Sequence, residues 1–111
     1  MLYRSTRGGP ERLGFREVTL RGLAPDGGLY MPETWPRLSP EGIAALRGLS
    51  YVDTAVAVMR PFLGGSISDE QLHSLCTLAY DRFAHRAVTP LVQLDARHWL
   101  LELFHGPTLA F

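Results

Sequence analysis

Residues 68–83, SDEQLHSLCTLAYDRF, carry the strongest structural signal in the chain. Ser68 followed three residues later by Gln71 is typical of a capping box, in which each side chain bonds the other residue's backbone N–H at a helix start. Apolar side chains then recur every three or four residues, as they do on the buried face of a helix. These positions are Leu72, Leu75, Cys76, Ala79, Tyr80 and Phe83. The pattern predicts a helix with one face against a core.

A second long helix is predicted immediately before this one. Ser50 can cap it, and Asp53 stands in the capping-box position. Its apolar positions again share one face: Val52, Ala55, Val56, Met59 and Leu63. Pro61 predicts a kink or an early stop, because proline lacks the backbone N–H that a helix needs. The Gly64-Gly65 pair then breaks the chain.

The first 48 residues carry weaker signals. The run 2–10, LYRSTRGGP, predicts a short strand and a turn. Residues 15–23, FREVTLRGL, fit either a helix or a strand, and we favour a helix. Asp26-Gly27-Gly28 is a strong turn signal. Residues 39–47, SPEGIAALR, begin with serine and proline at the N-cap and first helical positions, which predicts a short helix ended by glycine.

After the long helices the apolar pattern changes to that of strands. Leu91–Leu94 and Trp99–Phe104 predict two strands joined by a tight turn at residues 95–97. The predicted fold class is therefore α+β. A mainly helical body with short strands occupies residues 1–87, and a β-hairpin follows within residues 88–111.

Composition narrows the range of partners. The chain has 111 residues, is 46% apolar and has a formal net charge of zero, which is typical of one globular domain. Neutrality argues against nucleic acid or an anionic membrane as a partner, because both bind basic surfaces. One cysteine cannot form an internal disulfide, and no apolar run has transmembrane length, so we predict a cytoplasmic protein. All 11 basic residues are arginine, so no lysine amine can form a Schiff base.

The histidines do not predict a metal site. His73 and His85 lie on or near the last long helix but off its apolar face, and His98 lies at the hairpin turn. Solvent-facing positions are favoured for all three, because no paired Cys, Asp or Glu supplies the spacing of metal ligands. Cys76 lies on the apolar face, where a free cysteine usually acts as a small hydrophobic residue.

Two loops are candidates for function on their residues alone. Asp26-Gly27-Gly28 allows backbone to approach a neighbour closely, since glycine accepts conformations that other residues resist, although a structural turn is the favoured interpretation. His105-Gly106-Pro107-Thr108 follows an apolar strand, and α/β enzymes place ligand loops at the carboxyl ends of strands. A plain loop fits the spacing of this second segment equally well.

The stretch ELFHGPTLAF, residues 102–111, closely resembles the segment of the threonine synthase family that leads directly to the cofactor lysine. In that family the motif continues with lysine and aspartate. Five other segments resemble the family in the same order and spacing: STRGG at 5–9, GLAPDGGLYMP at 22–32, LSY at 49–51, PFLGG at 61–65 and VTPLVQL at 88–94. HGPTLAF is highly specific and DGGLY moderately so, and the resemblance covers essentially the whole chain.

This resemblance implies a pyridoxal-phosphate enzyme of the tryptophan-synthase-β-like fold type. Such an enzyme converts O-phospho-L-homoserine and water into L-threonine and inorganic phosphate, with the cofactor as an electron sink. Residues 1–87 would then be the family's N-terminal domain, and residues 88–111 would begin its α/β domain that binds pyridoxal phosphate.

The resemblance also implies roles for individual residues. The loop leading to the lysine would include His105, Gly106, Thr108 and Phe111. Of these, Thr108 is the candidate for a polar contact with substrate or cofactor, and Phe111 for packing beside the cofactor ring. Asp26, Gly27 and Gly28 are candidates for the active-site entrance. Ser5, Thr6 and Arg7 are candidates for binding the substrate phosphate, because arginine suits bidentate phosphate contacts, although a surface turn is favoured there.

Without a lysine, the chain is expected to be an inactive N-terminal fragment of a longer enzyme, with no pyridoxal phosphate bound. Its expected partners are the rest of its own catalytic domain and, through residues 88–111, other copies of itself. The parent would bind the small substrate O-phospho-L-homoserine. Two alternatives stay open: a free-standing interaction module without chemistry, and part of a threonine-synthase-like phospho-lyase.

Overall fold

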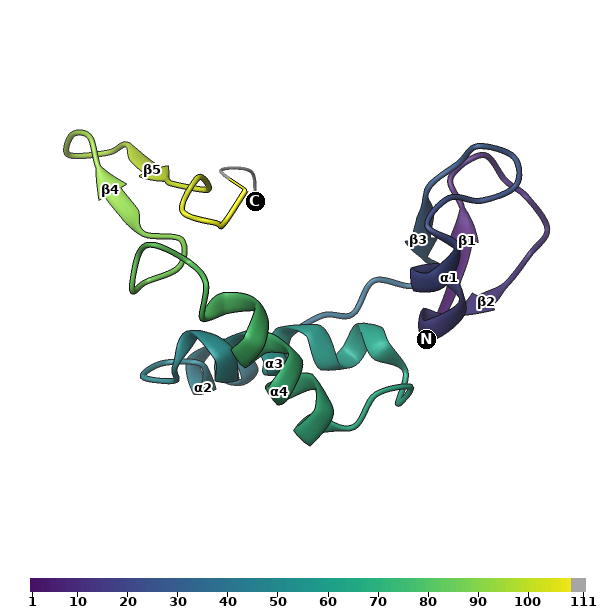
Figure 1. The fold of residues 1–111 in the computed structure, drawn as a ribbon, viewed down its shortest axis with the longest axis horizontal. Coiled ribbons are helices and arrows are strands. Elements are labelled where there is room, and N and C mark those ends of the chain that lie inside the picture. The colour runs from purple at the N-terminus through teal and green to yellow at the C-terminus, as the bar shows by residue number, and fades with distance from the viewer. Residues whose placement is uncertain (109–111) are drawn as a thin grey trace.

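The computed structural model describes residues 1–108, which form a small sheet, a group of helices and a separate hairpin (Figure 1). The sheet is antiparallel, and its strands in spatial order are β2 (Leu13–Gly14), β1 (Leu2–Ser5) and β3 (Tyr30–Pro32). In the register, Tyr3 of the central strand pairs with Leu13 on one side and with Pro32 on the other. Tyr3 and Ser5 are buried while their strand neighbours are exposed, because successive side chains of a strand point to opposite faces.

A short helix, α1 (Phe15–Arg21), follows β2 without a loop and confirms the helical prediction for this ambiguous stretch. The Glu17 carboxylate accepts a hydrogen bond from the Gly14 backbone N–H at 2.9 Å, which satisfies one of the free donors at the helix start. The Phe15 ring lies 6.2 Å from the Tyr3 ring, so the helix packs on the central strand, β1. Gly22 ends the helix with a φ of 75°.

The helical part contains α2 (Pro40–Ala45), α3 (Tyr51–Leu63) and α4 (Asp69–Tyr80). The predicted caps are confirmed: Ser39, Ser50 and Ser68 each accept a hydrogen bond from the backbone N–H three residues later. Gln71 also accepts a bond from the Ser68 N–H, which completes the predicted capping box. Within residues 1–108, no helix has the length and apolar character needed to cross a membrane.

Of the two outcomes predicted at Pro61, a kink or an early stop, the early stop is wrong. The helix α3 continues to Leu63, because a proline in the last turn removes little of the hydrogen-bond ladder. Gly64 then ends the helix in a left-handed conformation with a φ of 58°. At the other end, the Asp53 carboxylate accepts the Ser50 hydroxyl.

The core lies between α3 and α4. Its buried residues are Val56, Leu63, Leu72 and Cys76, with Phe15, Val52, Ala55, Ile67 and Tyr80 packed around them. The Tyr3 hydroxyl donates to the Phe62 carbonyl at 2.8 Å and so ties the sheet to α3. Leu75, predicted on the buried face of α4, is 53% exposed, because nothing within residues 1–108 covers that side of the helix.

The hairpin consists of β4 (Leu91–Gln93) and β5 (Trp99–Leu101), which pair antiparallel with Val92 opposite Leu100. All six strand residues are exposed. The strands are shorter than predicted, since the chain after Leu101 bends back towards the helical body. The radius of gyration is 16.4 Å, whereas a compact chain of this length has about 13 Å, so the described residues form an open shape (Figure 1).

Candidate functional site

The two N-terminal candidate triplets, residues 5–7 and 26–28, lie together in the structure. The buried Ser5 hydroxyl donates to Asp26 Oδ1 at 2.7 Å, and the Arg7 guanidinium donates to the Asp26 carbonyl at 2.9 Å. Thr6 completes the link: its hydroxyl accepts the Leu29 N–H at 3.0 Å. Residues that are about twenty positions apart therefore form one hydrogen-bonded cluster, which we call the Ser5–Asp26 cluster.

The glycines of this cluster are required by its geometry. Gly27 has a φ of 75°, which residues with a Cβ rarely adopt. A Cβ on the buried Gly28 would collide with the Ser5 hydroxyl. The backbone of the turn thus approaches Ser5 as closely as the Asp-Gly-Gly sequence predicted.

Hydrogen bonds determine the acidity of Asp26. The Ser5 hydroxyl, and then the Gly28 N–H at 2.9 Å, bond its carboxylate and lower the pKa of Asp26 below its usual value. The carboxylate is therefore charged at neutral pH and acts as the acceptor at the centre of the cluster.

A hollow of about 250 Å³ adjoins the Ser5–Asp26 cluster. Its lining consists of Ser5, Gly9, Pro10, Glu11, Ala24, Pro25, Asp26 and Tyr30. Both ionised groups in this lining, Glu11 and Asp26, are acidic, and such a lining repels phosphate. One N–H of the Arg7 guanidinium donates to the Asp26 carbonyl, so Arg7 helps to hold the turn.

The second candidate loop, residues 105–108, lies at the other end of the described chain. Gly106 is buried, and Thr108 is exposed in a turn. The imidazole Nε2 of His105 lies 2.7 Å from the Glu102 carboxylate, and the His105 carbonyl accepts the Ala84 N–H at 2.8 Å. Phe111, the candidate for packing beside the cofactor ring, lies outside the described residues.

The structure does not bring the two candidate regions together. The sheet that carries the Ser5–Asp26 cluster and the hairpin that precedes residues 105–108 lie at opposite ends of the long axis (Figure 1). Any site that uses both must include surfaces beyond residues 1–108.

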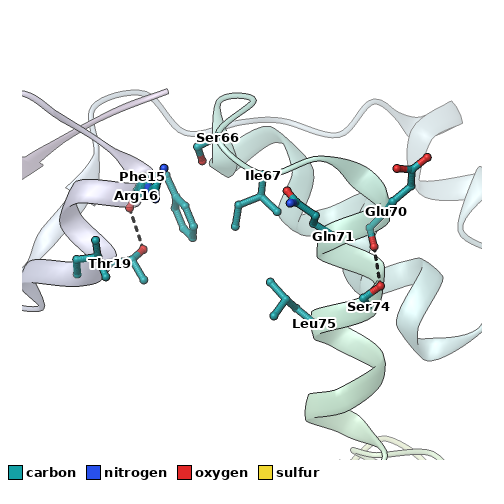
Figure 2. Close-up of a pocket in the computed structure, with 10 residues that line it drawn as sticks. Phe15, Arg16, Thr19, Ser66, Ile67, Glu70, Gln71, Ser74 and Leu75 are labelled. Atoms are coloured by element: carbon teal, nitrogen blue, oxygen red, sulfur yellow. Dashed lines mark hydrogen bonds between the residues drawn. The ribbon is translucent and has the colours of Figure 1, made fainter.

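A groove of about 710 Å³ was not predicted. It separates α1 from the start of α4, with Phe15 and Thr19 on one side and Ile67 and Leu75 on the other (Figure 2). The apolar face predicted for α4 was a usable signal, since Leu75 belongs to that pattern yet points into the groove. The lining offers packing surface and no cluster of reactive side chains.

The structure also shows the surroundings of the cysteine and of the residue types that bind metals. Cys76 is buried, and burial raises the pKa of its thiol, which fits the predicted hydrophobic role. Within residues 1–108 no group of three or more His, Cys, Asp or Glu side chains is arranged to hold a metal ion.

Comparison with known proteins gives consistent matches. Residues 2–80 match the family model described as the threonine synthase N terminus. The threonine synthase of Pseudomonas aeruginosa is 54% identical over 111 residues, which are 100% of this chain and 24% of that protein. The mouse protein named threonine synthase-like 2 is 42% identical over 112 residues, or 100% of this chain and 23% of that protein.

A solved structure agrees with these matches. The structure of threonine synthase from Brucella melitensis with bound pyridoxal phosphate superposes with a TM-score of 0.92 at 54% identity. The match covers 100% of this chain and 24% of that one. The chain thus spans about a quarter of the length of the relatives that it matches.

Proposed function

Because this chain belongs to the threonine synthase family, we propose that it forms the N-terminal part of an enzyme that makes L-threonine from O-phospho-L-homoserine and water. The observation that carries the proposal is the superposition on a threonine synthase with bound pyridoxal phosphate over the whole chain, with a TM-score of 0.92. That likeness accompanies a family-model match over residues 2–80.

Pyridoxal phosphate would supply an electron sink for a carbanion on the substrate. The 111 residues do not fit the covalent part of its binding, because none of them is a lysine. We therefore propose that the cofactor is anchored by residues outside this sequence, and that the 111 residues alone neither hold it covalently nor release phosphate.

Within the whole enzyme we propose a division of roles between the two candidate regions. Residues 105–108 border the cofactor, with Thr108 as the polar contact, and Phe111 packs beside the ring. The Ser5–Asp26 cluster holds the Asp26-Gly27-Gly28 turn in shape at the edge of the site. Ser5, Thr6 and Arg7 serve that turn through the hydrogen bonds described above, and direct contact with the substrate phosphate is the weaker candidate role.

The proposed partner of this chain is the remainder of the enzyme. The half-exposed apolar side chains of the hairpin, such as Trp99 and Leu91, are suited to burial against it. In its absence the same surface should cause self-association through residues 88–111. Sedimentation velocity over a range of concentrations tests this, and Trp99→Glu should restore the monomer. A chain that stays monomeric at high concentration would contradict it.

A chimera tests the catalytic proposal directly. The matched 111 residues of the Pseudomonas aeruginosa enzyme would be replaced by this chain, and the unmodified enzyme and a version lacking the segment would serve as controls. We expect the chimera to show the absorbance of bound pyridoxal phosphate and to form threonine and phosphate from O-phospho-L-homoserine. A chimera that folds but releases no phosphate would contradict the proposal.

We infer a second candidate function, a related phospho-lyase that does not make threonine, because the relatives include proteins named threonine synthase-like as well as threonine synthases. The two candidates predict different products when the whole enzyme to which this chain belongs, and not the chimera, is assayed with O-phospho-L-homoserine. Phosphate release with threonine supports the synthase, whereas phosphate release with a 2-oxo acid and ammonia supports the lyase.

A further inference from the structure

The segment Glu102–His105 is fastened to the preceding turn, residues 84–90, at both of its ends. The Glu102 N–H donates to the Pro90 carbonyl at 3.0 Å. The Ala84 N–H donates to the His105 carbonyl at 2.8 Å. Since Ala84 follows the last helix closely, these bonds connect the candidate loop to the end of the helical body.

The side chains of Glu102 and His105 form the most shielded ion pair among residues 1–108. Nε2 of His105 lies 2.7 Å from the Glu102 carboxylate. The His105 side chain is 18% exposed and the Glu102 side chain 22% exposed. In every other pair that the described residues make, both side chains are at least 38% exposed. A charge-assisted bond in this less solvated position should hold the imidazole more firmly than a surface pair would.

The rings of His85 and Phe104 both contact the His105 ring. The centroids of the His85 and His105 rings are 5.0 Å apart, with the planes at 48°. Nδ1 of His85 accepts the Ala87 N–H at 3.0 Å, so in this geometry the ring carries its proton on Nε2. The His85 carbonyl accepts the Val88 N–H at 2.8 Å.

The turn that carries His85 also has an unusual backbone. Val88 is buried and has a φ of 60°, a value that β-branched residues rarely adopt and that persists only where surrounding contacts hold it. The bond from the Val88 N–H to the His85 carbonyl supplies one such contact.

We propose that Glu102 and His85 are positioning residues, which both contact the His105 ring and so keep the loop 105–108 against residues 84–88. The inference rests on the proposed function, in which that loop borders the cofactor. It assigns to the Glu102–His105–His85 group the task of presenting the loop in one conformation before cofactor or substrate binds.

The test uses nuclear magnetic resonance on the 111-residue chain, at a concentration at which sedimentation velocity shows it to be monomeric. Hydrogen exchange of the Ala84 amide reports whether its bond to the His105 carbonyl is intact. Exchange of the Thr6 amide, which is bonded to the Leu29 carbonyl near the distant sheet, reports overall folding. Loss of a hydrogen bond to a charged group should make the Ala84 amide of Glu102→Ala exchange about tenfold faster while Thr6 stays unchanged. Glu102→Gln keeps an acceptor and should restore most of the protection. Glu70→Ala, on the exposed start of α4, is the control.

A second pair of variants tests His85. His85→Ala removes the acceptor of the Ala87 N–H and should accelerate exchange at Ala84 and Val88, whereas His85→Asn places a carbonyl oxygen near the position of Nδ1 and should rescue both. Imidazole ¹⁵N shifts should show His85 with its proton on Nε2. If Glu102→Ala unfolds the chain, amide exchange becomes faster at both Ala84 and Thr6. The two His85 variants then test the proposal.

Unchanged Ala84 exchange in both alanine variants, or a proton on Nδ1 of His85, would overturn the proposal. None of these measurements needs cofactor or turnover. Failure of this proposal in the exchange experiment and failure of the chimera to make threonine are therefore separate results.

Discussion

The helical body and the hairpin are both rich in apolar side chains, but only the body buries them. Leu63 and Leu72 are each 3% exposed, whereas Leu91 and Trp99 of the hairpin are 62% and 57% exposed. In the body, contacts join segments far apart in the sequence, such as Tyr3 with Phe62. In the hairpin, each strand pairs only with its near neighbour. The body should therefore be stable by itself, while the hairpin depends on a surface beyond residues 1–108.

The largest expected effect is the loss of stability from a substitution in the helical body that leaves the hairpin unchanged. Leu63→Ala removes a buried side chain at the junction of α3 with its neighbours and should lower the free energy of unfolding by about 2–5 kcal/mol. The matched control is Leu101→Ala in the hairpin, where the side chain is half exposed and the expected change is about 0.5 kcal/mol or less. Urea denaturation monitored by circular dichroism measures both. Equal losses would show that the two regions fold as one unit.

The next effect concerns the Ser5–Asp26 cluster. Gly28→Ala forces a methyl group against the Ser5 hydroxyl and should cost about 1–3 kcal/mol of stability, as overpacking does elsewhere. Gly42→Ala is the control, because a Cβ there makes only ordinary van der Waals contacts, with Ser39 and Leu38 just before α2, and should raise stability by up to about 1 kcal/mol. If both glycines respond alike in thermal denaturation, the close approach at Gly28 is not what the turn requires.

A smaller effect tests the link between the sheet and α3. Tyr3→Phe leaves the Phe62 carbonyl without its hydroxyl donor and should cost about 0.5–1.5 kcal/mol. Tyr30→Phe is the matched control, since its hydroxyl contacts only exposed side chains, Glu11 at 3.4 Å and the guanidinium of Arg21. The difference between the unfolding free energies of the two variants measures how much the Tyr3 hydrogen bond stabilises the attachment of the sheet to α3.

The same contrast explains what could be predicted from sequence. Helix starts at Ser39, Ser50 and Ser68 were predictable because capping depends on residues within one turn. The Asp26-Gly27-Gly28 turn was predictable for the same reason. Its pairing with Ser5 was not, because a hydrogen bond between residues 21 apart depends on the whole path of the chain between them.

Exposure was the least predictable property. Leu75 fits the apolar face of α4 as well as Leu72 does, yet it lines the groove in Figure 2 while Leu72 lies in the core. Periodicity identifies the apolar face of a helix, but it does not say which part of that face the same chain covers. The Glu102–His105 pair was missed as well, although its three-residue spacing in the motif was a signal that could have indicated it.

The smallest expected effect appears only in acid and concerns Asp26. The Ser5 hydroxyl and the Gly28 N–H lower the pKa of this carboxyl in the folded state below its value in the unfolded chain. A group with a lowered folded pKa contributes stability above its unfolded pKa, and that contribution is lost as the pH falls through the folded pKa. The wild type should therefore exceed Asp26→Asn in stability by a constant amount at neutral pH, and the difference should shrink below about pH 4.

Unfolding midpoints of both proteins, measured between about pH 2.5 and pH 7, check this expectation. Acidic groups elsewhere titrate in both proteins, so the difference between them isolates Asp26. Asp81→Asn at the end of α4 is the control, because the described structure records no hydrogen bond to its carboxylate. A wild-type advantage over Asp26→Asn that persists undiminished in acid would mean that Ser5 holds the turn through the shape of the side chain and not through its charge. The Ser5–Asp26 cluster would then resemble the packed core of the body more than an ionic contact.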